Sequence, residues 1–290
     1  MNYALLTKND NRKVRFILSL FILYLFSIYN ISAQEQMKTP VEGIIGKSGA
    51  LDKSAWAFFT NSAGLSDVED ITAGLGYSND YNLKELSSRS LFLIFPTKYL
   101  VVSGGFVHQG FDKFNTQHYN IAFSRKMAPW LNLSVRPHFI IRHQEQLEDI
   151  YLFTVDAGLQ LFPSDKVRFG FFIDNPAQSK WVLHNDEEEY QTTINRLAFG
   201  YSPSSNVDME VGVFKQDGYK TNISYSMSGS LHKNVILRGA VSSSPIKFGL
   251  GIGVKWQGLL FDMGLSNHST LGISSAFGIT YSFAKKKKSE

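Results

Sequence analysis

A long series of strand-like runs constrains the fold of this chain more than any other feature. Residues 207–214 alternate apolar and polar side chains, and residues 248–256 alternate large side chains with glycine. A period of two places alternate side chains on opposite faces of a β-strand. Almost no helical periodicity interrupts the series, so the sequence predicts an all-β fold.

The runs number about 14, and most are long enough to cross a bilayer as tilted strands. They lie near residues 71–79, 87–96, 99–109, 115–126, 130–143, 149–162, 166–175, 190–202, 206–215, 219–231, 234–242, 246–256, 259–266 and 271–283. This series is too long for one β-sandwich, the soluble alternative that alternation and turn spacing alone would allow. We therefore predict a transmembrane, antiparallel, up-and-down β-barrel over residues 71–284.

The connections between the runs alternate in character. Tight turns are expected at residues 96–98, 128–129, 163–165, 203–205, 232–233 and 257–258, and longer polar loops at residues 80–86, 110–115, 144–148 and 176–189. Outer-membrane barrels have short periplasmic turns and longer extracellular loops. The pattern predicts that the first strand runs outward and that the tight turns are periplasmic.

Aromatic residues stand beside five of the six tight turns. They are Tyr99, Trp130, Phe162, Tyr201 and Trp256. Aromatic rings prefer the membrane interface, so these residues predict an interfacial girdle, although aromatic residues are also favoured in strands generally. The last run ends in Tyr281 and Phe283, and pairing it with the first run would close the barrel.

The N-terminus has the three parts of a secretory signal. Basic residues between Lys8 and Arg15 precede an uncharged apolar stretch at residues 16–29, and Ala33 offers a small residue for cleavage. The apolar core is shorter than the roughly 20 residues of a membrane-spanning helix. We predict a signal peptide over residues 1–33, with an uncleaved anchor as the alternative, and a basic tail over residues 285–290.

Composition argues against several function classes. The chain has no cysteine, which excludes disulfides, thiolate metal sites, a cysteine nucleophile and a lipid-bearing cysteine. Its seven histidines are scattered without metal-site spacing, so no metal or other cofactor is predicted. The net charge of +4 comes largely from the two ends and does not indicate nucleic-acid binding. The Ser–Asn–His–Ser run at residues 266–269 lacks a nucleophile context, so no enzyme is predicted.

The segment before the first strand run differs in kind. Residues 46–65 lack a period of two and end in Asn61-Ser62-Ala63-Gly64-Leu65. This segment resembles the N-terminal hatch of FadL-type outer-membrane barrels, where a glycine-rich stretch precedes Asn-Pro-Ala-Gly-Leu, although Ser62 stands in place of the proline. It also resembles the PorV-type proteins of the Bacteroidota, as do residues 74–81, 175–177 and 271–283. PorP/SprF-type barrels are a weaker match.

The resemblance implies a barrel whose N-terminal segment, residues 34–70, folds into the lumen as a plug. A lumen of this size would leave a channel unless something filled it. The candidate plug residues are Trp56, Phe58, Phe59, Asn61, Gly64 and Leu65. The alternative is a periplasmic extension that merely precedes the barrel.

Three functions remain open at this stage. The first is a non-enzymatic outer-membrane accessory of type IX secretion or surface-protein assembly, with secretion-machinery proteins as partners. The second is a FadL-like channel for a hydrophobic ligand. The third is a structural surface barrel that makes contacts through the loop at residues 176–189. Each would contact outer-membrane lipid and lipopolysaccharide. The acidic run at residues 186–189 is expected to be solvated, with a divalent-cation site as its alternative.

Overall fold

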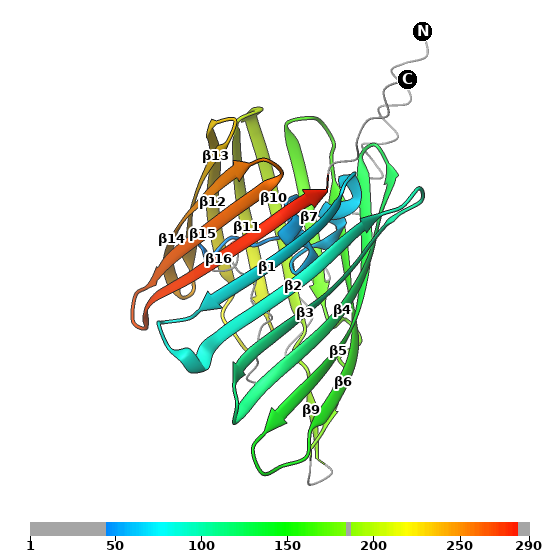
Figure 1. The fold of residues 1–290 in the computed structure, drawn as a ribbon, viewed down its shortest axis with the longest axis vertical. Coiled ribbons are helices and arrows are strands. Elements are labelled where there is room, and N and C mark those ends of the chain that lie inside the picture. The colour runs from blue at the N-terminus through cyan, green and yellow to red at the C-terminus, as the bar shows by residue number, and fades with distance from the viewer. Residues whose placement is uncertain (1–44, 184–186, 284–290) are drawn as a thin grey trace.

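The computed structural model describes residues 45–183 and 187–283. Within them, 14 strands form one closed antiparallel barrel (Figure 1). The predicted signal peptide, residues 34–44 of the predicted plug segment and the basic tail lie outside the described residues. The barrel strands are β1 Ile71–Asn79, β2 Ser87–Pro96, β3 Val101–Phe111, β4 Phe114–Ala128, β5 Leu131–Gln144, β6 Ile150–Leu161, β7 Val167–Asp174, β10 Ile194–Ser204, β11 Val207–Gln216, β12 Asn222–His232, β13 Val235–Ser243, β14 Ile246–Trp256, β15 Leu259–His268 and β16 Gly272–Phe283.

The first and last strands close the barrel, as the sequence predicts. Strand β1 pairs antiparallel with β16, and Ile71 stands opposite Phe283. Both residues therefore lie at the same end of the barrel, which we call the terminal end, and the opposite end is the loop end. Every other strand pairs with its neighbour in the chain, except that β7 pairs with β10.

The two faces of the wall differ in polarity. On β2, Leu91, Leu93 and Phe95 point outward and are 40–50% exposed, whereas Ser88 and Ser90 point inward and are buried. A water-soluble barrel has the reverse arrangement, while a membrane-spanning barrel carries an outer apolar band around a polar interior. The chain is therefore a transmembrane-type barrel, and the sandwich alternative is wrong.

The described helices are short 3₁₀ turns. They are η1 Ala55–Phe58, η2 Ser62–Asp67 and η3 Lys84–Leu86. None of the described helices is long and apolar enough to cross a membrane.

Two connections differ from expectation. The predicted longer loop at residues 110–115 is a two-residue turn, because β3 and β4 stay paired as far as Phe111 and Phe114. The loop between β7 and β10 contains a two-stranded sheet of β8 Lys180–Val182 and β9 Glu188–Tyr190. Strands of three residues carry too little alternation to be visible in a sequence.

Candidate functional site

The N-terminal segment fills part of the barrel lumen. Figure 1 shows the blue 3₁₀ turns enclosed by the strands near the terminal end. Trp56, Phe58, Phe59 and Leu65 are at most 1% exposed. They form one cluster with inward-facing side chains of the wall, which are Phe92, Ile94, Val101, Val107 and Ala122. We call residues 45–68 the plug.

Aromatic packing holds the plug against β2. The Phe92 ring meets Trp56 edge-to-face at 5.1 Å between centroids, and it meets Phe59 edge-to-face at 5.6 Å. Phe58 lies edge-to-face on Phe59 at 4.8 Å. Such pairs add about 0.5–1.5 kcal/mol each beyond the buried area.

Polar contacts hold the plug to other strands of the wall. Trp56 Nε1 donates to Asp262 of β15 at 3.0 Å. Asn61 Nδ2 donates to the backbone carbonyls of Leu159 and Phe171, each at 3.1 Å, and also to the plug's own Ala50 carbonyl at 2.8 Å. One amide therefore joins two turns of the plug to strands β6 and β7.

The final turn of the plug is held at the rim of the terminal end. Asp67 accepts from Lys126 Nζ at 2.7 Å and from Asn132 Nδ2 at 3.3 Å. Partial burial works to raise the pKa of Asp67, but the two hydrogen bonds and the nearby lysine charge outweigh it and hold the pKa below its usual range.

A series of inward-facing glycines lets the plug lie against the wall. At each of them a β-carbon would come within 3 Å of a plug atom, closer than real β-carbons approach. This glycine track consists of Gly105, Gly158, Gly170, Gly200, Gly212, Gly249 and Gly278. Gly64 of the predicted motif allows two turns of the plug to pack closely, since a β-carbon there would stand 1.9 Å from the Asp52 carbonyl oxygen.

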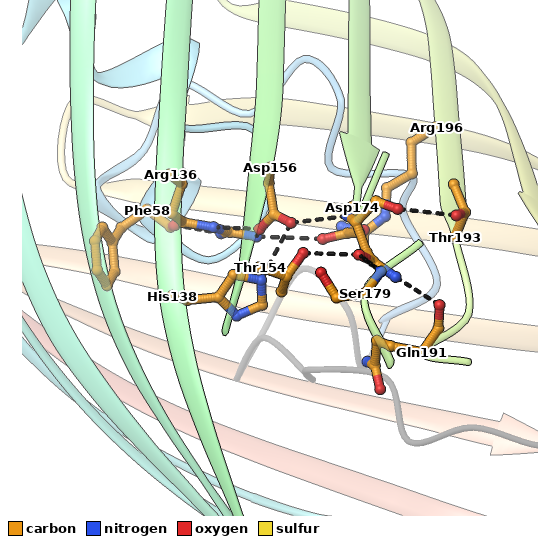
Figure 2. A network of polar contacts seen from close by, with 11 residues as sticks. Phe58, Arg136, His138, Thr154, Asp156, Asp174, Ser179, Gln191, Thr193 and Arg196 are labelled. Atoms are coloured by element: carbon orange, nitrogen blue, oxygen red, sulfur yellow. Dashed lines mark hydrogen bonds and ion pairs between the residues drawn. The ribbon is translucent and has the colours of Figure 1, made fainter. Parts of the chain in front are cut away.

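A buried ionic network joins the plug to strands β5, β6 and β7. Figure 2 shows Arg136 between the plug and the two carboxylates. Its guanidinium donates to the Phe58 carbonyl at 2.7 Å, to Asp156 at 2.8 and 2.9 Å, and to Asp174 at 3.3 Å. Arg196 makes a further ion pair with Asp174 at 3.3 Å. Buried charges persist only when paired in this way.

The network borders a small polar cavity beside His118 and His138. The two imidazoles stack with 6.4 Å between centroids, and both ring nitrogens of His118 lack a hydrogen-bond partner among the described atoms. The cavity measures about 30 Å³, enough for one or two water molecules. Water there would complete the hydrogen bonding of the imidazoles.

The wall is interrupted directly beyond this network. Strand β6 pairs with β7 only along residues 157–161, so within the described residues 150–156 have no strand partner on that side. Asn175 takes a φ of 50° and turns the chain out of the wall. Its side chain accepts from Thr154 at 2.8 Å and from the Ser179 backbone at 2.9 Å, and donates to the Gln191 carbonyl at 2.5 Å.

The β8–β9 sheet stands over the interruption and provides an apolar lining. Trp181 is 2% exposed and packs on Ile140 and Leu152, which face inward from β5 and β6. The Arg142 guanidinium lies 4.3 Å from the indole centroid, and Trp181 Nε1 donates to Gln191 at 2.8 Å. The loop end beside the interruption is therefore closed by an aromatic side chain.

The predicted girdle residues lie near the terminal end. Tyr99, Trp130, Tyr201 and Trp256 are 41–71% exposed, and Phe162 is partly buried. On the terminal strand, Tyr281 and Phe283 also face outward and meet edge-to-face at 4.7 Å. Phe162 differs from the other four girdle residues, because its ring centroid lies 4.6 Å from Nζ of Lys53 in the plug.

Sequence reasoning missed the charged residues of the lumen. Inward-facing positions of β5, β6 and β15 carry the charged residues Arg136, Asp156 and Asp262. Charge at such positions was the available signal, because an outward charge would face lipid. Among the described residues, no cluster of three or more histidines or carboxylates could hold a metal ion.

Comparison with known proteins places the fold. No protein-family model and no curated protein matches the chain. A FadL homologue of Pseudomonas aeruginosa superposes with a TM-score of 0.59 at 11% identity, over 88% of this chain and 100% of that one. The toluene transporter TodX of P. putida gives 0.63 at 9%, over 87% and 100%, and TbuX, the toluene transporter of Ralstonia pickettii, gives 0.63 at 9%, over 86% and 99%. At identities this low the superpositions establish the fold alone, which is a FadL-type barrel.

Proposed function

We propose that this FadL-type barrel is an outer-membrane channel for small hydrophobic molecules, closed along its axis and open through its side. The observation that carries the proposal is the interrupted wall between β6 and β7, where residues 150–156 have no strand partner among the described residues. The terminal end carries the short turns, so in the proposed orientation it faces the periplasm. The outer apolar band then contacts membrane lipid.

The plug favours a lateral route over an axial one. It is held by the Phe92 aromatic cluster, by Asn61 and by Arg136, and moving it would break all three sets of contacts together. A solute that leaves through the wall avoids this cost. A hydrophobic solute also gains by passing directly into hydrocarbon, because its apolar surface is never exposed to water.

The lining of the interruption suits such a solute. Ile140, Leu152 and Trp181 provide apolar surface beside it, and Tyr151 and Phe153 face lipid just outside at 56% and 61% exposure. The structural neighbours support the same class of ligand, since they include toluene transporters and a monoaromatic hydrocarbon channel.

The experiment targets Asn175, whose side chain fixes the turn at the edge of the interruption through Thr154, the Ser179 backbone and the Gln191 carbonyl. Asn175→Ala removes three hydrogen bonds, each contributing about 0.5–1.5 kcal/mol. We expect uptake of a labelled monoaromatic hydrocarbon by cells expressing the protein to fall by about tenfold or more. Asn222→Ala, which removes a hydrogen bond to the Ser244 carbonyl at a site three strands from β7, is the control and should retain uptake.

Two further measurements make the result decisive. Heat-modifiable gel mobility verifies that each variant forms a closed barrel. Asn175→Gly tolerates the positive φ but loses the same side-chain bonds, so it should also reduce uptake. Wild-type uptake by both folded Asn175 variants, or no uptake by the wild-type protein above that of empty cells, would refute a lateral channel.

The secretion-accessory role stays a prediction based on the N-terminal segment. It is tested by affinity purification from native outer membranes, where recovery of the barrel without a secretion-machinery component would count against it. The structural role of the loop at residues 176–189 is tested by deleting that loop and measuring surface binding.

A further inference from the structure

A polar chamber opens beside the plug at the terminal end. Its volume is about 200 Å³, and it lies between the beginning of the plug and strands β7, β11, β12 and β13. Ser205, Asn206 and Ser230 border it at the tight turns and are exposed. The chamber is therefore accessible from the periplasmic side in the orientation proposed above. It is separate from the wall interruption and from the apolar plug cluster.

The carboxylates of the chamber are already engaged. Asp208 accepts from Arg168 at 2.7 Å, Glu210 accepts from Ser48 and lies 3.8 Å from Lys47 Nζ, and Asp52 accepts from the Ser54 backbone at 2.8 Å. Asp208 and Glu210 are thus paired with cations of the wall and the plug, and Asp52 with a backbone N–H group. The remaining donors decide what the chamber can bind.

Two cationic donors remain available. Arg168 is 8% exposed, and its Nε has no hydrogen-bond partner among the described residues although its terminal nitrogen binds Asp208. The guanidinium lies over Gly200, where a β-carbon would stand 3.4 Å from Nε. Lys53 Nζ stands 4.6 Å from the Phe162 ring centroid, and no carboxylate of the described residues lies within ion-pair distance of it.

These two cations lie near enough to affect each other. Both side chains line the chamber. Burial and the positive charge of Arg168 lower the pKa of Lys53, and the carboxylates of Asp208 and Asp67 offset part of this effect. Two neighbouring cations with free donors are stabilised by an anion between them. An oxyanion suits both, because it accepts charge-assisted hydrogen bonds from a guanidinium and from an ammonium group.

We infer that the chamber is a second, periplasm-facing site that binds a small oxyanion, the carboxylate or phosphate group of a water-soluble solute, between Lys53 and Arg168. This inference goes beyond the proposed transport of hydrophobic molecules, since its ligand is polar and its residues lie outside the lateral route. The serines of β12, Ser226, Ser228 and Ser230, also line the chamber and offer hydroxyl groups to the rest of such a solute.

Isothermal titration calorimetry on the purified full barrel in detergent, at low ionic strength, tests the site. Inorganic phosphate and glutarate are the two probes, and the tighter one identifies the preferred oxyanion. We expect saturable binding that weakens by about tenfold in Lys53→Gln and in Arg168→Gln, as for the loss of a charge-assisted hydrogen bond. Arg168→Lys retains a cation but lacks the Nε donor, so it should bind with intermediate affinity.

The control is Lys233→Gln, which removes an exposed lysine from another turn at the same end. It should bind both probes as the wild-type protein does. If Lys233→Gln weakened probe binding as much as Lys53→Gln, the binding would reflect general surface charge and the assignment of the site would be refuted. Absence of saturable binding to either probe would overturn it as well. Heat-modifiable mobility checks the fold of each variant, and a folded Lys53→Gln barrel that binds normally would also refute the assignment.

Discussion

The glycine track can be tested at Gly170, where wall and plug come closest through backbone atoms. A β-carbon there would stand 2.2 Å from the Ala50 carbonyl oxygen and 2.6 Å from its carbon. Ordinary contact begins near 3.4 Å, so Gly170→Ala must displace the plug by about an ångström. No flexible side chain can absorb the shift, because the opposing atoms belong to the backbone.

The displacement has a cost that follows from the contacts. The Ala50 carbonyl accepts from Asn61 at 2.8 Å and from Gln160 at 3.2 Å, and both bonds would lengthen or break. Overpacking costs about 1–3 kcal/mol and each lost bond about 0.5–1.5 kcal/mol, so the seated plug loses roughly 2–6 kcal/mol. We expect this to shift the plug and leave the strand pairing of the wall intact.

Ion conductance in planar bilayers measures that shift directly. The wild-type barrel should be nearly silent, and Gly170→Ala should show frequent open-channel currents. Gly104→Ala is the matched control, because Gly104 faces outward on β3 beside Gly105 of the glycine track, and a β-carbon there would stand 3.9 Å from its nearest neighbour, the Asn120 carbonyl oxygen. If Gly170→Ala is as silent as Gly104→Ala and melts at the same temperature, the glycine track does not seat the plug.

Three further predictions follow from the contacts of the plug and the network. Trp56→Phe keeps an aromatic ring but loses the hydrogen bond from the indole N–H to Asp262, so limited proteolysis should reach the plug more readily, with a destabilisation of about 1.5–3 kcal/mol. Arg136→Met leaves Asp156 charged and buried, so heat-modifiable mobility should show a loss of about 3–5 kcal/mol, partly restored by adding Asp156→Asn. The lowered pKa of Asp67 means that its stabilising contribution is complete above the usual carboxyl range and is lost as pH falls through the lowered value. Melting curves between neutral and strongly acidic pH should therefore show an acid-dependent loss of up to about 1 kcal/mol that Asp67→Asn lacks. A pH profile unchanged by Asp67→Asn, or normal melting of Arg136→Met, would contradict the corresponding argument.

The wall was predictable because its chemistry is local. Each strand alternates between lipid and lumen, so the sequence marks β1, β2 and β14 at their observed ends. The closing pairing of β1 with β16 was also predicted, as the pairing of the last run with the first. The three-residue strands β8 and β9 were missed because so short a segment contains no readable period.

The lumen was less predictable because its contacts join distant parts of the chain. Gly170 reads as a residue that lets a strand curve, and only the structure shows Ala50 lying against it. Arg136 is recognisable as an inward charge, but its partners Asp156 and Asp174 depend on the register of three strands. The hatch resemblance predicts that residues 46–65 form a plug, but it does not identify the wall residues that hold them.

The position of the plug ahead of β1 also has a consequence for assembly. Asn61 binds carbonyls of β6 and β7, and Trp56 binds Asp262 of β15. The plug therefore contacts strands from the middle of the chain and from near its end. The wall closes only when β16 reaches β1, a pairing that spans most of the described chain and forms slowly for that reason. A plug that entered after closure would have to pass Trp56 and the neighbouring aromatic side chains into a barrel that is already closed. One that is present beforehand offers the growing sheet a surface to curl around, and the plug would then act as the template on which the barrel takes its curvature.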